Sequence, residues 1–205
     1  MKLKEKVKNS KFSKTKLFKS LLNNKYCLLA AGCTFLLILA VYCAYELIPL
    51  GNKTVLRMDL YHQYGPLFCE LYDRVIQGKS FLYSWTSGGG SSFLGNYFNY
   101  LSSPFNIILF LFDRKNMPLA ITTIVAVKGI ACSGTFTFYL KKSLNRHSAS
   151  SAMFGLFYAF SGYFLAYFWN VMWLDGMIIL PLIVLGIERI INKGKPALYF
   201  FSSIY

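Results

Sequence analysis

The feature that most constrains the fold of this chain is the length of its apolar runs. Residues 26 to 45 carry no charge, and further apolar runs cover about 118 to 140, 148 to 168 and 176 to 191. About 20 apolar residues cross the hydrocarbon core of a bilayer as a helix. Of all residues, 55% are hydrophobic and 18% are aromatic. We therefore expect an all-α polytopic membrane protein, because helices satisfy their own backbone hydrogen bonds in lipid.

Positive charge is concentrated before the first apolar run, in a chain whose net charge is +14. The lysines of this segment face only Glu5 as an opposing charge: Lys2, Lys4, Lys6, Lys8, Lys11, Lys14, Lys16, Lys19 and Lys25. Such a segment is attracted to anionic lipid headgroups, and no module that reads nucleic acid accompanies it. We expect residues 1–25 to be a cytoplasmic polybasic tail whose partner is the lipid bilayer and not nucleic acid.

The cysteines indicate neither a metal site nor a disulfide framework. Four of the five lie in apolar runs, and Cys69 lies alone outside them. The first run is longer than the apolar part of a signal peptide, and Glu46 and Pro49 stand where a small-residue cleavage site would be. We therefore expect residues 26–48 to be an uncleaved first span.

The topology depends on whether Pro104 to Phe112 crosses the membrane. If it does not, the basic clusters at 141–146 and 189–195 lie on the same side as the N-terminal tail. If it does cross, both clusters lie outside. The positive-inside bias favours the first arrangement, in which the N-terminus is cytoplasmic and residues 49–116 form an extracytoplasmic loop.

Residues 117–205 then hold three more spans. The last of these is followed by an apolar run from Ala197 to Tyr205 that stops before it could cross. We therefore expect the chain to be the N-terminal part of a larger protein.

Within the expected external loop, Pro66 to Gln77 has the pattern of an amphipathic helix. Apolar side chains recur at helical spacing on one side, and Pro66 and Gly78 suit its two ends. A helix of this kind lies on a membrane surface or on neighbouring spans. We expect Thr86 to Ser92, which contains three consecutive glycines, to be a loop, and Phe93 to Tyr100 to lie in the headgroup interface.

Two aspartates are the candidate catalytic residues. Asp59 lies just past the first span, where a carboxylate could take a proton from a hydroxyl nucleophile, although an ion pair with Arg57 or a capping role would also explain it. Asp175 precedes the last span and could be its N-cap. The favoured topology puts both on one side, where two carboxylates could share a divalent cation or divide the base and orienting roles. The sequence indicates no other cofactor.

Other residues near these acids are candidates for binding substrate: His62, Gln63, Gly88, Gly89, Gly90, Lys128 and Trp173. His62 could share a helical face with Asp59 or simply extend to the interface. The glycines could present backbone amides to a phosphate or only supply flexibility. Lys128 lies near the middle of a span, where an unpaired cation is costly. It could form an ion pair with Glu46, near the outer end of the first span, and could equally extend to an internal water-filled cavity.

Four ordered motifs resemble the YfhO family of bacterial polytopic membrane proteins. They are Met58 to Tyr64 (MDLYHQY), Leu82 to Phe93 (LYSWTSGGGSSF), Ser103 to Asn106 (SPFN) and Met172 to Gly176 (MWLDG). Members of that family are several times longer, so the resemblance covers about their first quarter. The family is similar in plan to the GT-C glycosyltransferases, and this implies a GT-C-like helical bundle with interfacial helices in the first external loop.

The resemblance also implies a function at the outer face of the bacterial cytoplasmic membrane. GT-C enzymes use a polyprenyl-phosphate sugar as donor and place a catalytic acid in the first external loop. This implies Asp59 as the base, Asp175 as the second acid, and a cell-wall polymer such as teichoic acid as the acceptor. Two alternatives remain open: a transporter or lipid flippase that uses Lys128 and Glu46 as a charge relay, and a non-catalytic scaffold.

Overall fold

A computed structural model describes residues 23–204, so all of the expected polybasic tail before Asn23 lies outside the described part. The elements in chain order are α2 (Lys25–Ala44), η1 (Leu60–Tyr64), α3 (Gly65–Gln77), β1 (Tyr83–Ser84), β2 (Ser91–Ser92), α4 (Phe93–Asn96), η2 (Tyr97–Leu101), η3 (Pro104–Leu111), η4 (Arg114–Asn116), α5 (Met117–Lys142), α6 (Ala149–Ala159), α7 (Gly162–Tyr167), α8 (Trp173–Ile191) and α9 (Ala197–Ile204). The expected all-α fold is confirmed.

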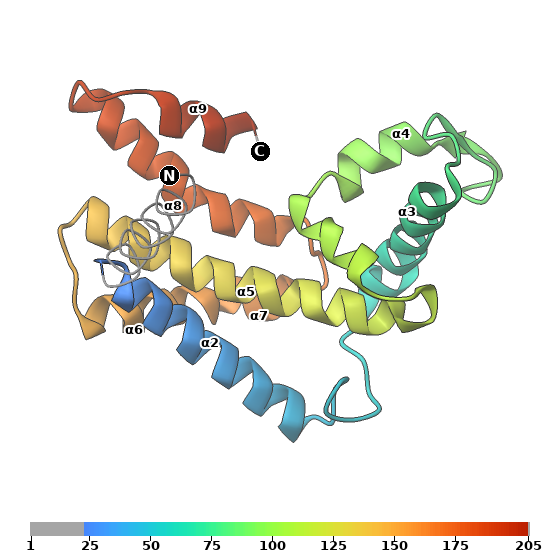
Figure 1. Cartoon of the computed structure of the whole chain (residues 1–205), viewed down its shortest axis with the longest axis horizontal. Helices are drawn as coiled ribbons and strands as arrows, with labels where there is room; N and C mark the ends of the chain where they lie inside the picture. The colour runs from blue at the N-terminus through green and yellow to red at the C-terminus, as the bar shows by residue number, and fades with distance from the viewer. Residues whose placement is uncertain (1–22, 205) are drawn as a thin grey trace, which may run out of the picture.

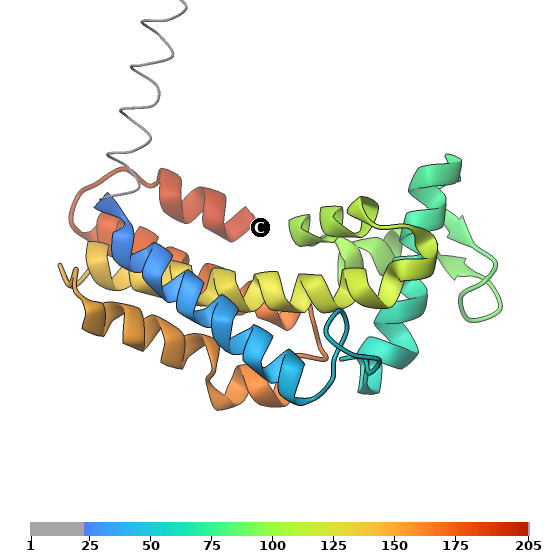
Figure 2. The same ribbon diagram turned by 60° about the horizontal axis from the view of Figure 1, so that its bottom comes forward.

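Helix α5 is the centre of a bundle (Figures 1 and 2). It packs against α2, α6 and α8, and α9 packs along α8. Buried side chains occur along the whole helix, from Met117 near its start to Leu140 near its end, and every residue between them is buried or half-buried. A helix that is apolar on every side is typical of the inside of a membrane bundle.

Three helical segments are long and apolar enough to cross a membrane: Lys25–Ala44, Arg114–Lys142 and Ala149–Tyr167. The third is interrupted between α6 and α7, where the side chain of Ser161 accepts a hydrogen bond from the backbone N–H of Phe164 and starts the new helix. The fourth expected span corresponds to α8, which is of similar length but contains Asp175, Glu188 and Arg189. Its two acidic residues distinguish it, because the other three segments contain no Asp or Glu.

Residues between α2 and α5 form a compact cap at one end of the bundle (Figure 1). The predicted amphipathic helix is confirmed as α3, and Gly78 ends it with a φ of 62°, a left-handed conformation that favours glycine. Leu67, Phe68 and Leu71 are buried on its inner face. The apolar face of α3 is therefore used to pack the cap.

Arg74 does not lie on the exposed face of α3, where the helical pattern placed it. It is 7% exposed, and its guanidinium donates to the Glu70 carboxylate and to the backbone carbonyls of Ser80 and Tyr83. The guanidinium also lies over the ring of Phe93, 4.2 Å from its centroid. One arginine therefore holds the segment after α3 against the helix.

The glycine-rich segment is a loop at the tip of a short hairpin. The predicted loop extended to Ser92, whereas Ser91 and Ser92 form a strand. Tyr83–Ser84 pairs antiparallel with Ser91–Ser92, so the serines belong to a strand. Gly90 has a φ of 121°, and a Cβ there would lie 2.1 Å from the Tyr83 hydroxyl. Glycine is required at this position by both its backbone conformation and its neighbour.

The apolar segment before α5 does not continue into a span. It forms η3, a 3₁₀ helix of 8 residues that packs on α5 within the cap. At about 2 Å per residue it is much shorter than the hydrocarbon core. This is the geometry that the non-crossing alternative requires.

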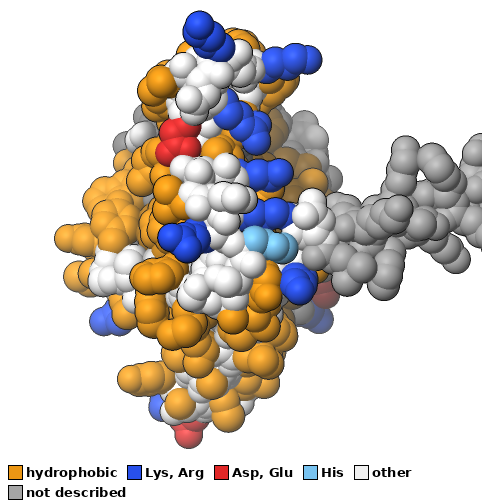
Figure 3. All heavy atoms as spheres, turned by 90° about the vertical axis from the view of Figure 1, so that its left-hand side faces the viewer, with side chains coloured by type: hydrophobic (Ala, Val, Ile, Leu, Met, Phe, Trp, Pro, Cys, Tyr) orange, Lys and Arg blue, Asp and Glu red, His pale blue; other side chains and the backbone are white. Residues whose placement is uncertain are grey.

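Basic side chains gather at the end of the bundle opposite the cap. Figure 3 shows this face, with several Lys and Arg side chains and one His in view. The exposed cations there come from the start of α2, the end of α5 and the end of α8: Lys25, Lys142, Arg146, Arg189, Lys193 and Lys195. Both basic clusters that the sequence placed on one side therefore lie at the same end of the bundle.

Helices α5 and α6 approach closely at a small residue. A Cβ built on Gly155 of α6 would lie 2.0 Å from the Thr137 hydroxyl and 2.7 Å from the Ser133 backbone carbonyl of α5. Small residues at such contacts allow membrane helices to pack backbone against backbone. Space for a larger side chain would require the two helices to separate.

We predict that Gly155→Val destabilises the protein by about 1–3 kcal/mol, because it overpacks the α5–α6 contact. Thermal unfolding in detergent measures this effect. Gly134→Ala is the control, since nothing lies within 4 Å of a Cβ at Gly134 of α5. Equal stability of Gly155→Val and Gly134→Ala would contradict the contact.

Candidate functional site

A buried ion pair joins α5 to α8. The Nζ atom of Lys128 donates to the Asp175 carboxylate at 2.8 Å and to the backbone carbonyl of Val171 at 3.0 Å. Lys128 is fully buried, Asp175 is 8% exposed, and the ring of Phe105 lies 5.7 Å from Nζ. Inside an apolar bundle each charge needs the other, because an isolated ion would cost several kcal/mol.

The ion pair between Lys128 and Asp175 shows that two interpretations of the sequence were wrong. Glu46 is not the partner of Lys128, since it forms an exposed ion pair of 2.7 Å with Lys53 in the loop after α2. Asp175 is not the N-cap of the last span either. Helix α8 begins at Trp173, its N-cap residue is Met172, and Asp175 lies in its first turn with its carboxylate directed to Lys128.

Asp175 also lines a cavity of ≈ 560 Å³ between the end of η2 and the start of α8. Three aromatic and two serine side chains line it as well, together with Asn99, Met172, Gly176 and Ile179. The rings of Trp173 and Tyr163 are stacked, with 6.4 Å between their centroids. The hydroxyl of Ser103, another lining residue, is buried and has no hydrogen-bond partner among the described residues. Aromatic rings beside polar groups and a carboxylate are suited to binding a sugar ring.

Tyr64 connects the first loop to the segment before α8. Its hydroxyl donates to the Oδ1 atom of Asn170, and its ring is fully buried. Burial raises the pKa of the Tyr64 phenol. The hydrogen bond to Asn170 joins the segment that follows Asp59 to the segment that precedes Asp175.

Asp59 is exposed and occupies the start of the helix that leads into α3. The helix passes through a π-helical turn, Leu60–Tyr64, directly after Asp59. No ion pair within residues 23–204 involves Asp59, so the expected alternative of pairing with Arg57 is wrong. The Arg57 guanidinium instead lies 6.0 Å from the ring centroid of Phe168.

The other predicted binding residues do not form one site. Trp173 and Lys128 belong to the region of Asp175, while Gln63 is half-buried in the π-helical turn. His62 is exposed, packs edge-on against Tyr61, and lines a second, larger hollow beside α3. The substrate-binding role of each of these residues therefore stays a prediction.

In the glycine loop, Gly88, Gly89 and Gly90 all have positive φ, a backbone conformation that favours glycine. The amide of Gly90 already donates to the carbonyl of Ser87. Among the described residues, no group of three or more His, Cys, Asp or Glu side chains is placed to hold a metal ion.

Sequence reasoning did not identify Tyr64 and Asn170, because each is an ordinary residue in its own segment. A signal that could have identified them is their position in the sequence: Tyr64 is five residues after Asp59, and Asn170 is five residues before Asp175. Their contact spans 106 positions, and only folding brings them together.

We predict that Lys128→Met destabilises the protein by about 3–5 kcal/mol, because it leaves the Asp175 charge without its ammonium partner in the bundle. Thermal unfolding in detergent measures the loss, with Lys115→Met at an exposed position as the control. The double variant Lys128→Met, Asp175→Leu is expected to be more stable than Lys128→Met alone. If the two changes were additive, the pair would not be coupled.

One of the comparisons with known proteins identifies the family of the chain. A family model described as bacterial membrane protein YfhO matches residues 30–204. No curated protein and no solved structure gives a match. The matched residues include most of α2, the whole cap, and α5 to α9, so they contain both acids and the buried ion pair. The chain therefore belongs to the YfhO family of bacterial membrane proteins.

Proposed function

We propose that the protein is a glycosyltransferase that moves a sugar from a polyprenyl-phosphate donor to a cell-wall polymer outside the membrane. The observation that carries this proposal is the position of Asp59 and Asp175. Tyr64, five residues after Asp59, donates a hydrogen bond to Asn170, five residues before Asp175, so one buried contact joins the two segments that carry the acids. Asp59 is exposed, and Asp175 lines a cavity that contains aromatic and hydroxyl side chains.

The exposed acid is suited to the role of base. In the proposed step, the Asp59 carboxylate takes the proton of an acceptor hydroxyl, and the hydroxyl oxygen bonds to the anomeric carbon of the donor sugar. The bond between that carbon and the phosphate oxygen breaks, and the lipid phosphate leaves with the electron pair. Asp59 is not held in any ion pair of the described chain, so its carboxylate can reach an incoming hydroxyl.

The cavity beside Asp175 is the proposed site of the donor sugar. The indole of Trp173 offers an apolar face for the ring, and the Asp175 carboxylate can accept hydrogen bonds from sugar hydroxyls. The Lys128 ammonium fixes the position of that carboxylate from the other side. Asp175 is thus a binding and orienting residue in this proposal, and Asp59 is the base.

The buried pair also gives a physical basis to the alternative of transport, since charged residues inside a bundle mark ion and substrate pathways. This alternative now rests on Lys128 and Asp175 and no longer on Glu46. The two functions differ at Asp59. A relay inside the bundle would survive its replacement, whereas a transferase would lose its base.

We predict that Asp59→Asn lowers the rate of sugar transfer by at least about 100-fold, because the amide cannot accept the proton. The sugar content of the wall polymer in cells that carry the variant measures this loss. Asp113→Asn is the matched control, since Asp113 is an exposed aspartate of the same cap. Unchanged sugar content in Asp59→Asn cells would refute the assignment.

The proposal also requires the cap to face the outside of the cell. We predict that Thr86→Cys, at an exposed position of the hairpin, reacts with a membrane-impermeant maleimide in intact cells. Asn192→Cys, exposed at the opposite end of the bundle, is expected to react only after permeabilisation, and the unsubstituted chain gives the background. The reverse pattern would place the acids in the cytosol and exclude the proposed reaction.

A further inference from the structure

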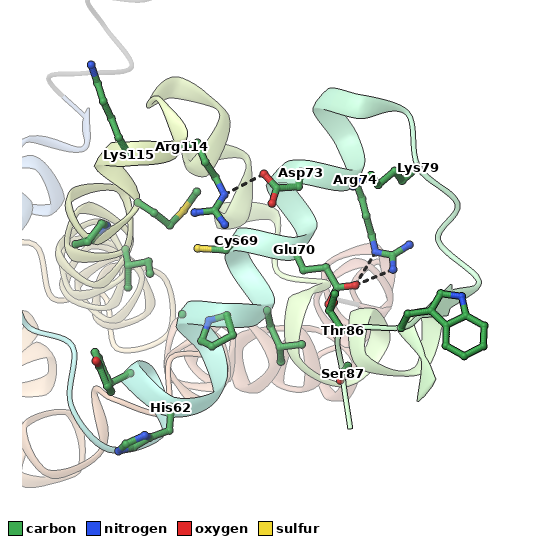
Figure 4. A pocket seen from close by; sticks show the side chains of 18 of the residues that line it. His62, Cys69, Glu70, Asp73, Arg74, Lys79, Thr86, Ser87, Arg114 and Lys115 are labelled. Atoms are coloured by element: carbon green, nitrogen blue, oxygen red, sulfur yellow. Dashed lines mark hydrogen bonds and ion pairs between the residues drawn. The ribbon is translucent and has the colours of Figure 1, made fainter. Parts of the chain in front are cut away.

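A hollow with a volume of ≈ 1210 Å³ lies in the cap, between α3, the hairpin and the start of α5 (Figure 4). Its wall contains four cationic side chains, Arg74, Lys79, Arg114 and Lys115, against the two carboxylates of Glu70 and Asp73. The lining therefore has an excess of two positive charges.

The carboxylates of the hollow are already neutralised by arginines. Arg74 pairs with Glu70 at 2.7 Å, and Arg114 pairs with Asp73 at 2.9 Å through its Nε atom (Figure 4). The terminal nitrogens of Arg114 meet no hydrogen-bond acceptor in the part of the chain that the structure describes. Arg114 therefore keeps donors for a ligand even while it is paired.

The two lysines supply the excess charge. Lys79 is exposed and forms no ion pair within residues 23–204, and the contact of Lys115 with Asp113 is long, at 3.9 Å, between exposed side chains. An exposed pair of this kind contributes little. In Figure 4 the two lysines stand at opposite sides of the hollow, with Arg114 and Asp73 between them.

Aromatic side chains accompany these cations. Trp85 is 80% exposed, and Tyr83 packs edge-on against it at 4.9 Å between ring centroids. Tyr61 lines another part of the wall. Large exposed rings beside cations suit a ligand that alternates negative groups with sugar or polyol units.

The location of the cations is informative because external segments of membrane proteins are depleted of Lys and Arg. The cap lies at the end of the bundle opposite the main basic cluster, yet its hollow is positively charged. Lys79 has no ion pair among residues 23–204, and Lys115 has only a long one, although both lie in a segment where Lys and Arg are disfavoured. Positive charge at such positions indicates a negatively charged partner.

We propose that the hollow beside α3 binds the acceptor as an extended polyanion, a polymer of phosphodiester-linked polyol or sugar units. This inference rests on the proposed function and adds the acceptor site to it. The volume exceeds the range of about 300–1000 Å³ that is usual for one small ligand, and cations on two sides of the hollow suit a chain that passes across it. Arg74 contributes by holding the hairpin that forms one wall.

The test is binding of a fluorescent poly(glycerol phosphate) chain to the protein in nanodiscs of phosphatidylcholine, which carries no net charge. We expect the affinity to fall with increasing salt and Lys79→Gln to weaken binding about fivefold. The double variant Lys79→Gln, Lys115→Gln is expected to weaken binding by about 25-fold if the two contacts are independent. Lys53→Gln removes one exposed cation outside the hollow and serves as the matched control.

Competing probes identify the ligand. Unlabelled poly(glycerol phosphate) is expected to displace the fluorescent chain, whereas neutral dextran is not. Displacement by inorganic phosphate or by polyprenyl phosphate at the same phosphate concentration would overturn the assignment to an extended polymer. Equal binding by Lys79→Gln, the double variant and the unsubstituted protein would also overturn it.

A further variant separates this proposal from the proposed function. Asp59→Asn is expected to abolish sugar transfer while leaving the affinity for the polymer unchanged, because Asp59 does not line the hollow. Active transfer together with polymer binding that is insensitive to Lys79 and Lys115 would refute the acceptor site alone. Polymer binding that depends on the two lysines, with no transfer by the unsubstituted protein, would refute the proposed function alone.

Discussion

The pairing of Lys128 with Asp175 is the constraint on which the arrangement of the bundle depends. Lys128 lies in the middle of α5, the helix that every other span contacts, and it is fully buried. Its ammonium binds both the carboxylate of Asp175 and the carbonyl of Val171. These two contacts fix the position of the start of α8 along the axis of α5. A shift of α8 by one turn would leave two buried charges apart, at a cost that few packing gains could offset.

That fixed point positions the parts of the molecule that come from distant segments. Asn170, next to Val171, accepts a hydrogen bond from Tyr64, so the cap is joined to the same place at which α8 begins. Asp59 precedes Tyr64 by little more than one helical turn. Hydrogen bonds therefore connect the segment of Asp59, the cavity beside Asp175 and the buried ion pair, although these parts are far apart in the sequence.

The cap depends on a second charged contact, that of Arg74. Helix α3 was predictable from its apolar repeat and from Gly78, because both are local signals. The helical pattern placed Arg74 with the solvent-facing residues, since a charged residue on the polar side of a helix is normally exposed. Burial of Arg74 becomes favourable only when Glu70, two backbone carbonyls and the ring of Phe93 meet its guanidinium together. No local pattern contains that information.

The sequence by itself determined the helical spans, the grouping of basic residues and the family, because hydropathy, charge and ordered motifs are properties of consecutive residues. It also identified Lys128 as a cation that needs a partner. Only the tertiary structure decided that the partner is Asp175 and not Glu46, and that the polar side of α3 forms the wall of a positively charged hollow. The physical reason is that an ion pair forms between whichever opposite charges the packing of helices brings within a few ångströms, and separation along the chain does not set that distance.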